Sequence, residues 1–264
     1  MLHGLSGSPA SEHVQSMLRA ALALPARAAA LGFRKGQGPP LLHHAGRSAD
    51  VGRAVEHLLD GEPLLIVGLS LGGSLLLKWL AEQGEGAPAR VAAAALCVPY
   101  DLAGAVATLD SSPLRRLYQA SMVGALKAQV RGLLRRHPHL LDRRRVACIR
   151  TLAEFDEIVV APLAGFASAA DYWARCSTRG VLGRIRRPTL LLSARDDPFM
   201  RPEHLPGPAE LASPWLRADF QDRGGHLGFL GPGLRPWSEE RVMAWFRELL
   251  ARPQATSMRL PSTR

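Results

Sequence analysis

The chain has 264 residues, of which 47% are hydrophobic, enough for one large α/β domain or one domain with an insertion. This composition excludes a chain that is disordered throughout, and no apolar run approaches the roughly 18 residues needed to span a bilayer. The N-terminus lacks the basic start and the apolar stretch of a secretory signal peptide, so we expect a cytoplasmic protein. Three widely spaced cysteines without a CxxC pair predict neither a disulfide framework nor a zinc knuckle.

The net charge of +10 is concentrated in one part of the chain. Nine arginines and one lysine lie between Arg115 and Arg150, against the single acid Asp142. Such a strip fits the solvated face of helices, or a surface that attracts phosphates or an anionic membrane. No nucleic-acid-binding motif accompanies it, so we expect no nucleic-acid partner. Peripheral membrane contact through Arg115–Arg150 stays open as an alternative.

The first element with a clear pattern is the unbroken apolar run Leu64–Val67, which predicts a buried parallel strand. A helix is expected over Gly72–Gln83, where apolar residues share one face. A second apolar run, Val91–Val98, predicts another buried strand. Strand, helix and strand in this order indicate a βαβ unit and a parallel sheet.

The composition and the apolar pattern of the chain change after residue 100. The next stretch is rich in arginine, lacks a comparable apolar run, and has helical spacing at Leu114–Leu134 and at Phe166–Trp173. A strand follows at Thr189–Leu192, and an amphipathic helix at Glu239–Leu250 closes the pattern. We therefore expect three parts: residues 1–100 as the N-terminal part of an α/β core, 101–183 as a helical cap insertion, and 184–264 as the C-terminal part of the core.

The pentapeptide from Gly68 to Gly72 has the pattern G-x-S-x-G, with Ser70 at its centre. It directly follows the strand at Leu64–Val67 and opens the next helix, which is the strand–turn–helix setting of a nucleophile elbow. Glycines are needed there because side chains beside so tight a turn would collide with the adjoining strand and helix. The pattern predicts Ser70 as a nucleophile; the alternative is that Ser70 only caps the helix.

A nucleophilic serine needs a base, and the base needs an acid that orients it. Asp197 follows the strand at Thr189–Leu192, and His226 comes 29 residues later between glycines. The order Ser70, Asp197, His226 is that of an α/β-hydrolase triad. Asp196 is the alternative acid. The remaining paired histidines lack a carboxylate or cysteine at ligand spacing, so we expect no metal and no cofactor there; they are His43, His44, His137 and His139.

An oxyanion hole takes two backbone N–H groups. The residue after the nucleophile, Leu71, is expected to supply one of them. The loop His3-Gly4-Leu5 has the form that supplies the second, which makes the Leu5 amide the candidate donor.

With these residues assembled, the chain resembles the YheT-like branch of the α/β-hydrolases. Further segments that carry the resemblance are 32–36, 44–46 with Asp50, 154–156, 165–166 with 171–172, 188–199 and 224–229. The resemblance implies a serine esterase with a helical cap, and places the triad on Ser70, Asp197 and His226. It also implies several strands before the His3-Gly4-Leu5 loop, and we expect those N-terminal strands to be missing from the sheet here.

Together these features predict an α/β-hydrolase fold, with a mostly parallel sheet flanked by helices, that cleaves carboxylic esters through an acyl-enzyme on Ser70. The expected substrate is a small-molecule or lipid ester, although thioesters, lactones and amides can be cleaved by the same triad. The alternatives are a non-catalytic or truncated hydrolase-fold protein, and a lipase or phospholipase that works at a membrane surface.

Overall fold

The computed structural model describes residues 1–33 and 42–251. Its centre is a four-stranded, wholly parallel sheet in the order β1-β2-β3-β4. The strands are β1 (Leu64–Leu69), β2 (Val91–Leu96), β3 (Thr189–Ala194) and β4 (Leu216–Gln221). All residues of β2 and β3 are buried, as expected for unbroken apolar runs in central parallel strands. The prediction of a parallel sheet flanked by helices is confirmed.

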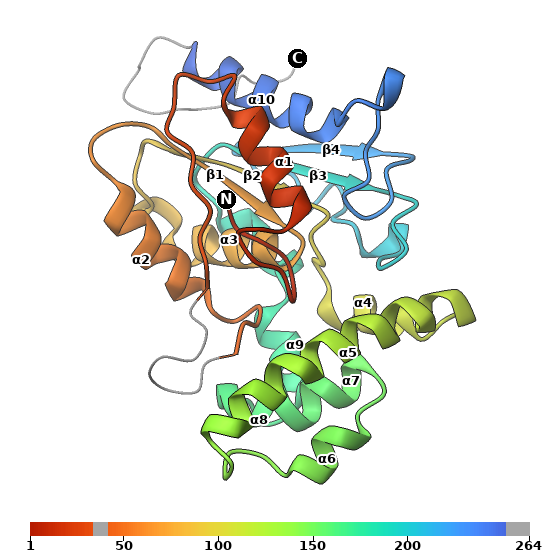
Figure 1. Ribbon diagram of the computed structural model, residues 1–264. Coiled ribbons are helices and arrows are strands. Elements are labelled where there is room, and N and C mark those ends of the chain that lie inside the picture. The colour runs from red at the N-terminus through yellow and green to blue at the C-terminus, as the bar shows by residue number, and fades with distance from the viewer. Residues whose placement is uncertain (34–41, 252–264) are drawn as a thin grey trace.

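Two pairs of helices cover the two faces of the sheet (Figure 1). Successive side chains of a strand point to opposite faces, so Ala93 and Ala95 of β2 pack toward one pair of helices and Ala92 and Ala94 toward the other. The first pair is α2 (Ser48–Leu58) and α3 (Leu71–Gln83), and the second is α1 (Glu12–Ala21) and α10 (Trp237–Leu250). Alanine and glycine along β1 and β2 leave room for helices to lie close to the strands.

Among the described residues before β1, Leu2 is the one that pairs with a strand of the sheet. Leu2 forms isolated parallel bridges to Gly68 and to Leu31, and its side chain is buried. Its N–H donates to Val67 O at 2.8 Å, and its carbonyl accepts from Leu69 N at 3.0 Å. These bonds hold the start of the His3-Gly4-Leu5 loop against β1.

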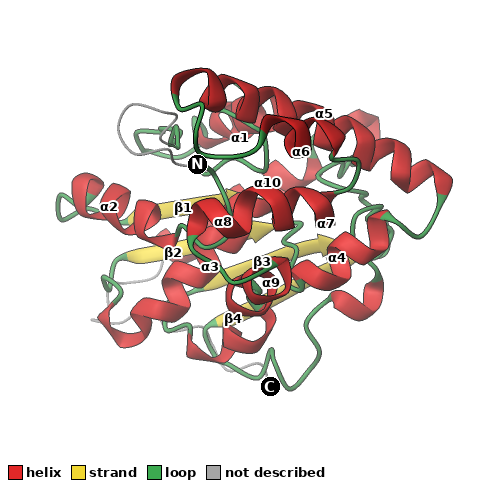
Figure 2. Cartoon of the chain, turned by 90° about the horizontal axis from the view of Figure 1, so that it is seen from below, coloured by secondary structure: helices red, strands yellow, loops and turns green. Residues whose placement is uncertain are grey.

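Six helices lie between β2 and β3, and we call this segment the cap. It has a hydrophobic cluster of its own, separate from the two clusters that flank the sheet. Viewed from the cap side, its helices lie in front of the strands (Figure 2). They are α4 (Leu102–Leu109), α5 (Pro113–Arg136), α6 (Arg143–Cys148), α7 (Leu152–Phe155), α8 (Ala161–Ala164) and α9 (Ala169–Cys176), with a π-helical turn at Asp156–Val160.

The longest cap helix, α5, begins with a clear N-terminal signal: the Ser112 hydroxyl accepts the N–H of Arg115, and Pro113 is the first helical residue. Short 3-10 turns complete the described chain at Gly84–Gly86, Arg179–Arg184, Pro202–His204 and Pro232–Leu234. Among the described residues, no helix has both the length and the apolar character needed to cross a bilayer.

Candidate active site

Ser70 stands on the sharp turn between β1 and α3, as the sequence predicts. Its backbone has φ 51° and ψ −120°, a strained conformation for a residue with a side chain. The glycines at 68 and 72 are there of necessity. A Cβ on Gly68 would lie 2.6 Å from Gly72 O, and a Cβ on Gly72 would lie 2.6 Å from the carbonyl oxygens of Leu2 and His3. Strain held in place by such close backbone packing is typical of functional turns.

The structure brings the three predicted triad residues together. His226 Nε2 lies 3.0 Å from Ser70 Oγ, and His226 Nδ1 lies 2.8 Å from Asp197 Oδ2. The Asp197 side chain is wholly buried, and its other oxygen accepts the N–H of Phe199 at 2.8 Å. Both carboxylate oxygens are therefore hydrogen-bonded, which holds the Asp197 side chain in place against the imidazole. The ring of Phe199 packs edge-on against His226 at 4.4 Å.

Asp196, the alternative acid, has a different partner. Its Oδ1 accepts the N–H groups of Gly224 and Gly225 at 2.9 and 2.8 Å. The turn at Gly225 has φ 55°, a left-handed value that suits glycine. Asp196 therefore holds the backbone of the histidine loop, whereas Asp197 contacts the imidazole itself.

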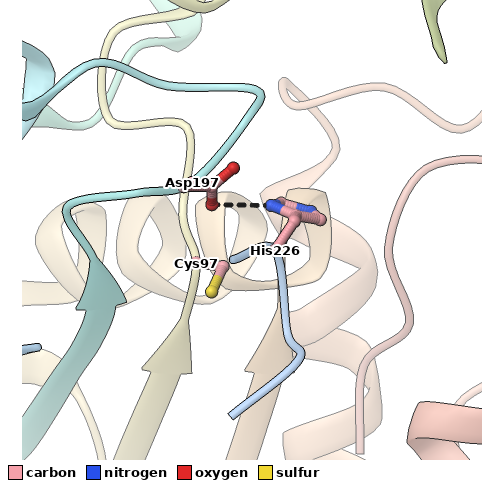
Figure 3. A group of neighbouring side chains, drawn as sticks. All are labelled: Cys97, Asp197 and His226. Atoms are coloured by element: carbon pink, nitrogen blue, oxygen red, sulfur yellow. Dashed lines mark hydrogen bonds and ion pairs between the residues drawn. The ribbon is translucent and has the colours of Figure 1, made fainter. Parts of the chain in front are cut away.

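Cys97 lies directly beside Asp197 and His226 (Figure 3). It follows β2, so that residues following all four strands meet at the carboxyl edge of the sheet. Its sulfur accepts the N–H of Leu227 at 3.4 Å and lies 3.9 Å from Gly225 O, one residue on each side of His226. Sequence reasoning missed this role because the sulfur reaches the histidine loop only through the pairing of strands far apart in the chain.

The same three side chains form the one His, Cys and Asp group close enough to share a metal ion among residues 1–33 and 42–251. Burial, reinforced by the nearby Asp197 carboxylate, raises the pKa of the Cys97 thiol far above its ordinary range. The thiolate, which is the form that binds metals, is therefore strongly disfavoured. His226 and Asp197 are instead hydrogen-bonded in a chain that ends at Ser70.

The two residues predicted to donate to the oxyanion, Leu5 and Leu71, both lie near Ser70. Leu71 is the first residue of α3, where a backbone N–H has no acceptor within the helix. Leu5 lines the same cavity as Ser70. The loop before it lies close to the serine, since a Cβ on Gly4 would lie 3.2 Å from Ser70 Cβ. Whether both amides bind an oxyanion stays a prediction.

A cavity of about 320 Å³ extends from Ser70 into the cap. Its wall is mostly apolar and is supplied by several cap helices, with Leu109, Met122, Leu126, Leu152, Phe155 and Val160 among the lining residues. His43 and His44, which the sequence did not assign to the active site, also line it. Burial lowers the pKa of His43 to about 3 and that of His44 to about 4, so both rings are neutral near pH 7.

Asp156 is the one carboxyl side chain that lines this cavity within the described chain. It begins the π-helical turn, and its Oδ2 accepts the indole N–H of Trp173 at 2.7 Å. Burial raises the pKa of Asp156 from 3.8 to about 7, although the Trp173 hydrogen bond acts in the opposite direction.

This pKa predicts a pH-dependent cost in stability. Between pH 3.8 and about 7 the folded state retains a proton on Asp156 that the unfolded chain has lost, so stability falls as the pH rises through this window. The variant Asp156→Asn keeps an acceptor for Trp173 without ionising. At about pH 8 its free energy of unfolding is expected to exceed that of the wild type by up to about 4 kcal/mol, so it should unfold at a higher urea concentration. At about pH 4 the two proteins should differ little.

Urea unfolding of both proteins at the two pH values measures this difference. Glu62→Gln, which removes the charge of an exposed acid far from the cap, is the control and is expected to behave like the wild type at both. A variant Asp156→Asn that gains no stability at the higher pH would contradict the prediction.

The comparisons with known proteins agree with this geometry. Residues 31–230 match the family described as alpha/beta hydrolase fold. The chain belongs to the α/β-hydrolase family. It is 31% identical to the putative esterase YheT of Escherichia coli over 262 residues, which cover 95% of this chain and 76% of that protein. The predicted resemblance to the YheT-like branch is confirmed.

This α/β-hydrolase is also similar to the medium-chain fatty acid ethyl ester synthase/esterase 2 of Saccharomyces cerevisiae. The two are 28% identical over 205 residues, which cover 69% of this chain and 45% of the yeast protein. The chain thus spans less than half of that relative. Among solved structures, an esterase from Pyrococcus furiosus, Pf2001, superposes with a TM-score of 0.57 at 16% identity, covering 94% of this chain and 81% of that one, which shows the same fold.

Proposed function

We propose that this α/β-hydrolase cleaves carboxylic esters by a serine mechanism with Ser70 as nucleophile, His226 as general base and Asp197 as the residue that orients the imidazole. The observation that carries the proposal is the continuous hydrogen-bonded chain from Ser70 Oγ through His226 to Asp197, with distances of 3.0 and 2.8 Å. Relatives named as esterases support ester hydrolysis as the reaction class.

In this mechanism Ser70 Oγ attacks the ester carbonyl carbon while His226 Nε2 takes its proton. The amides of Leu5 and Leu71 donate hydrogen bonds to the oxyanion of the tetrahedral intermediate. Protonated His226, stabilised by the Asp197 carboxylate, then gives its proton to the departing alcohol oxygen, which leaves an acyl group on Ser70. A water molecule that loses its proton to His226 attacks the acyl carbonyl, and the acid is released as Ser70 regains its proton.

The cavity supports an apolar acyl group as the part of the substrate that enters the cap. Ester oxygens would meet the polar groups near Ser70, while the surrounding leucine, methionine and phenylalanine side chains offer contact only to hydrocarbon. The yeast relative's name refers to medium-chain fatty acid ethyl esters, which accords with a fatty acyl chain here.

A fluorophosphonate probe tests the proposal, because it reacts with a serine only when a base activates it. Wild-type protein is expected to be labelled, with the probe on the peptide that contains Ser70. Ser70→Ala is expected to take no label. The control is Ser74→Ala, which removes a buried hydroxyl from the same helix one turn further on and should leave labelling intact. Wild-type protein that melts cooperatively yet takes no label would favour the non-catalytic alternative.

A further inference from the structure

The solvent-facing side of α5 has an unusual distribution of residues. Its inward side packs into the cap through residues such as Val123, Leu126 and Val130. On the outward side, Leu114 and Leu117 have exposed fractions of 65% and 69%, and Tyr118 is also exposed. These three lie at helical spacing within the first turns, so they form one apolar patch that the rest of the cap does not cover.

The same outward side becomes basic toward the end of the helix. Arg131, Arg135 and Arg136 are exposed, and Arg135 and Arg136 lie on the same side as Leu117 and Tyr118 five turns earlier. Between the two ends the outward residues are small: Ser121, Gly124, Ala125, Ala128 and Gly132. The face therefore carries no acid and no bulky obstruction along its length.

The basic residues of this region have no acidic partner at ion-pair distance among the described residues. None of the ten basic residues from Arg115 to Arg150 forms an ion pair inside the part of the chain that the structure describes. Asp142, the single acid of the strip, instead accepts the N–H groups of Arg144 and Arg145 at the start of α6. An unpaired basic surface of this kind is complementary to an anionic partner.

The apolar patch is also connected to the active site. The Tyr118 ring packs edge-on against Phe199, with 5.8 Å between the ring centroids. The Phe199 ring in turn packs against His226, with 4.4 Å between the centroids. Phe199 lines the cavity. A partner seated on the start of α5 would therefore lie one aromatic ring away from the wall of the substrate cavity.

We propose that the outward face of α5 docks on an anionic lipid surface, with Leu114, Leu117 and Tyr118 entering the headgroup region and the arginines of α5 and α6 contacting lipid phosphates. Peripheral membrane helices combine apolar residues that enter the lipid with basic residues that contact anionic headgroups, and the outward side of α5 carries both, at its two ends. A nucleic acid or an acidic protein would be attracted by the arginines but would gain little from bare leucines. The proposal does not depend on the catalytic mechanism, and it identifies the surface through which a lipid ester would be approached.

Vesicle sedimentation tests the proposal, with Ser70→Ala as the background so that no lipid is hydrolysed. We expect the protein to sediment with vesicles that contain phosphatidylglycerol much more than with pure phosphatidylcholine, and to dissociate as salt is raised. The triple variant Arg131→Ala, Arg135→Ala, Arg136→Ala should weaken binding to the anionic vesicles on the order of a hundredfold, since each basic contact contributes roughly fivefold. Leu114→Ser with Leu117→Ser should weaken it about tenfold or more.

Matched controls come from elsewhere on the surface. Arg223→Ala, Arg235→Ala and Arg247→Ala together remove three exposed arginines outside the strip, and Leu22→Ser with Leu234→Ser removes two exposed leucines. Both controls should bind anionic vesicles like the parent, and all variants should retain its melting temperature.

Three results would overturn the proposal. The first is no binding to anionic vesicles at low salt. The second is an equal loss of binding in the control variants, which would mean general charge attraction. The third is binding that needs the α5 arginines but not its leucines, which would mean that charge alone holds the protein on the vesicle and that the apolar patch does not enter the lipid. Labelling of Ser70 by a fluorophosphonate is independent of all three, so failure of the docking proposal is distinguishable from failure of the catalytic one.

Discussion

Ser70→Ala is expected to reduce kcat for a short-chain nitrophenyl ester by about 10⁵- to 10⁶-fold, because the acyl-enzyme route is lost with the nucleophile. A residual rate above that of water is expected, since the cavity and the backbone amides near Ser70 remain in place. Steady-state kinetics on wild type and variant measure the effect. Removing one hydroxyl from the turn leaves the Gly68 and Gly72 contacts unchanged, so the variant should melt like the wild type.

A small change in kcat for Ser70→Ala would contradict the nucleophile assignment and favour the alternative in which Ser70 only occupies the helix start. The structure records no side-chain cap by Ser70 on α3. Its hydroxyl is directed instead to the imidazole of His226. A pre-steady-state burst of nitrophenol in the wild type, absent from the variant, would give a second measure that depends on the acyl-enzyme itself.

Much of the core was predictable because its signals are local. Unbroken apolar runs identified β1, β2 and β3, since a strand buried on both faces has no polar side to show. β4 was missed because it lies at the edge of the sheet and carries Arg217 and Asp219, which are not buried. Helices α1 and α2 were also not predicted, because each buries only a few separated apolar residues, such as Val14 and Met17 in α1, and so has no apolar run that stands out in the sequence.

The parts of the site that could be predicted are those marked by a local motif or by the order of reactive residues along the chain. The elbow is contiguous in sequence, and an acid after a strand followed by a glycine-flanked histidine has few other interpretations. What could not be predicted depends on distances between remote segments. The sequence could not place Asp156, His43 and His44 on the wall of one cavity, nor Cys97 beside His226, because each of these positions is set by packing of the cap or by strand register.

The choice between Asp196 and Asp197 is of the same kind, and kinetics can separate them. Asp197→Asn is expected to lower kcat by about 10⁴-fold, because an amide cannot stabilise the imidazolium and can hold the ring in the wrong tautomer. Asp196→Asn keeps a carbonyl oxygen that can still accept the N–H groups of Gly224 and Gly225, so a loss of about tenfold or less is expected from a looser histidine loop.

The two aspartates are adjacent, and each substitution replaces one carboxylate oxygen with an amide nitrogen. The two variants therefore differ only in what the changed side chain contacts. Each variant is therefore the control for the other, and kcat for the same nitrophenyl ester is the measurement. Equal losses would mean that the loop, rather than the imidazole, is what the acidic pair supports; a larger loss for Asp196→Asn would reverse the assignment. The structure favours Asp197 because its wholly buried carboxylate lies 2.8 Å from His226 Nδ1. The positive charge that His226 gains during the reaction would be costly there without a carboxylate to balance it.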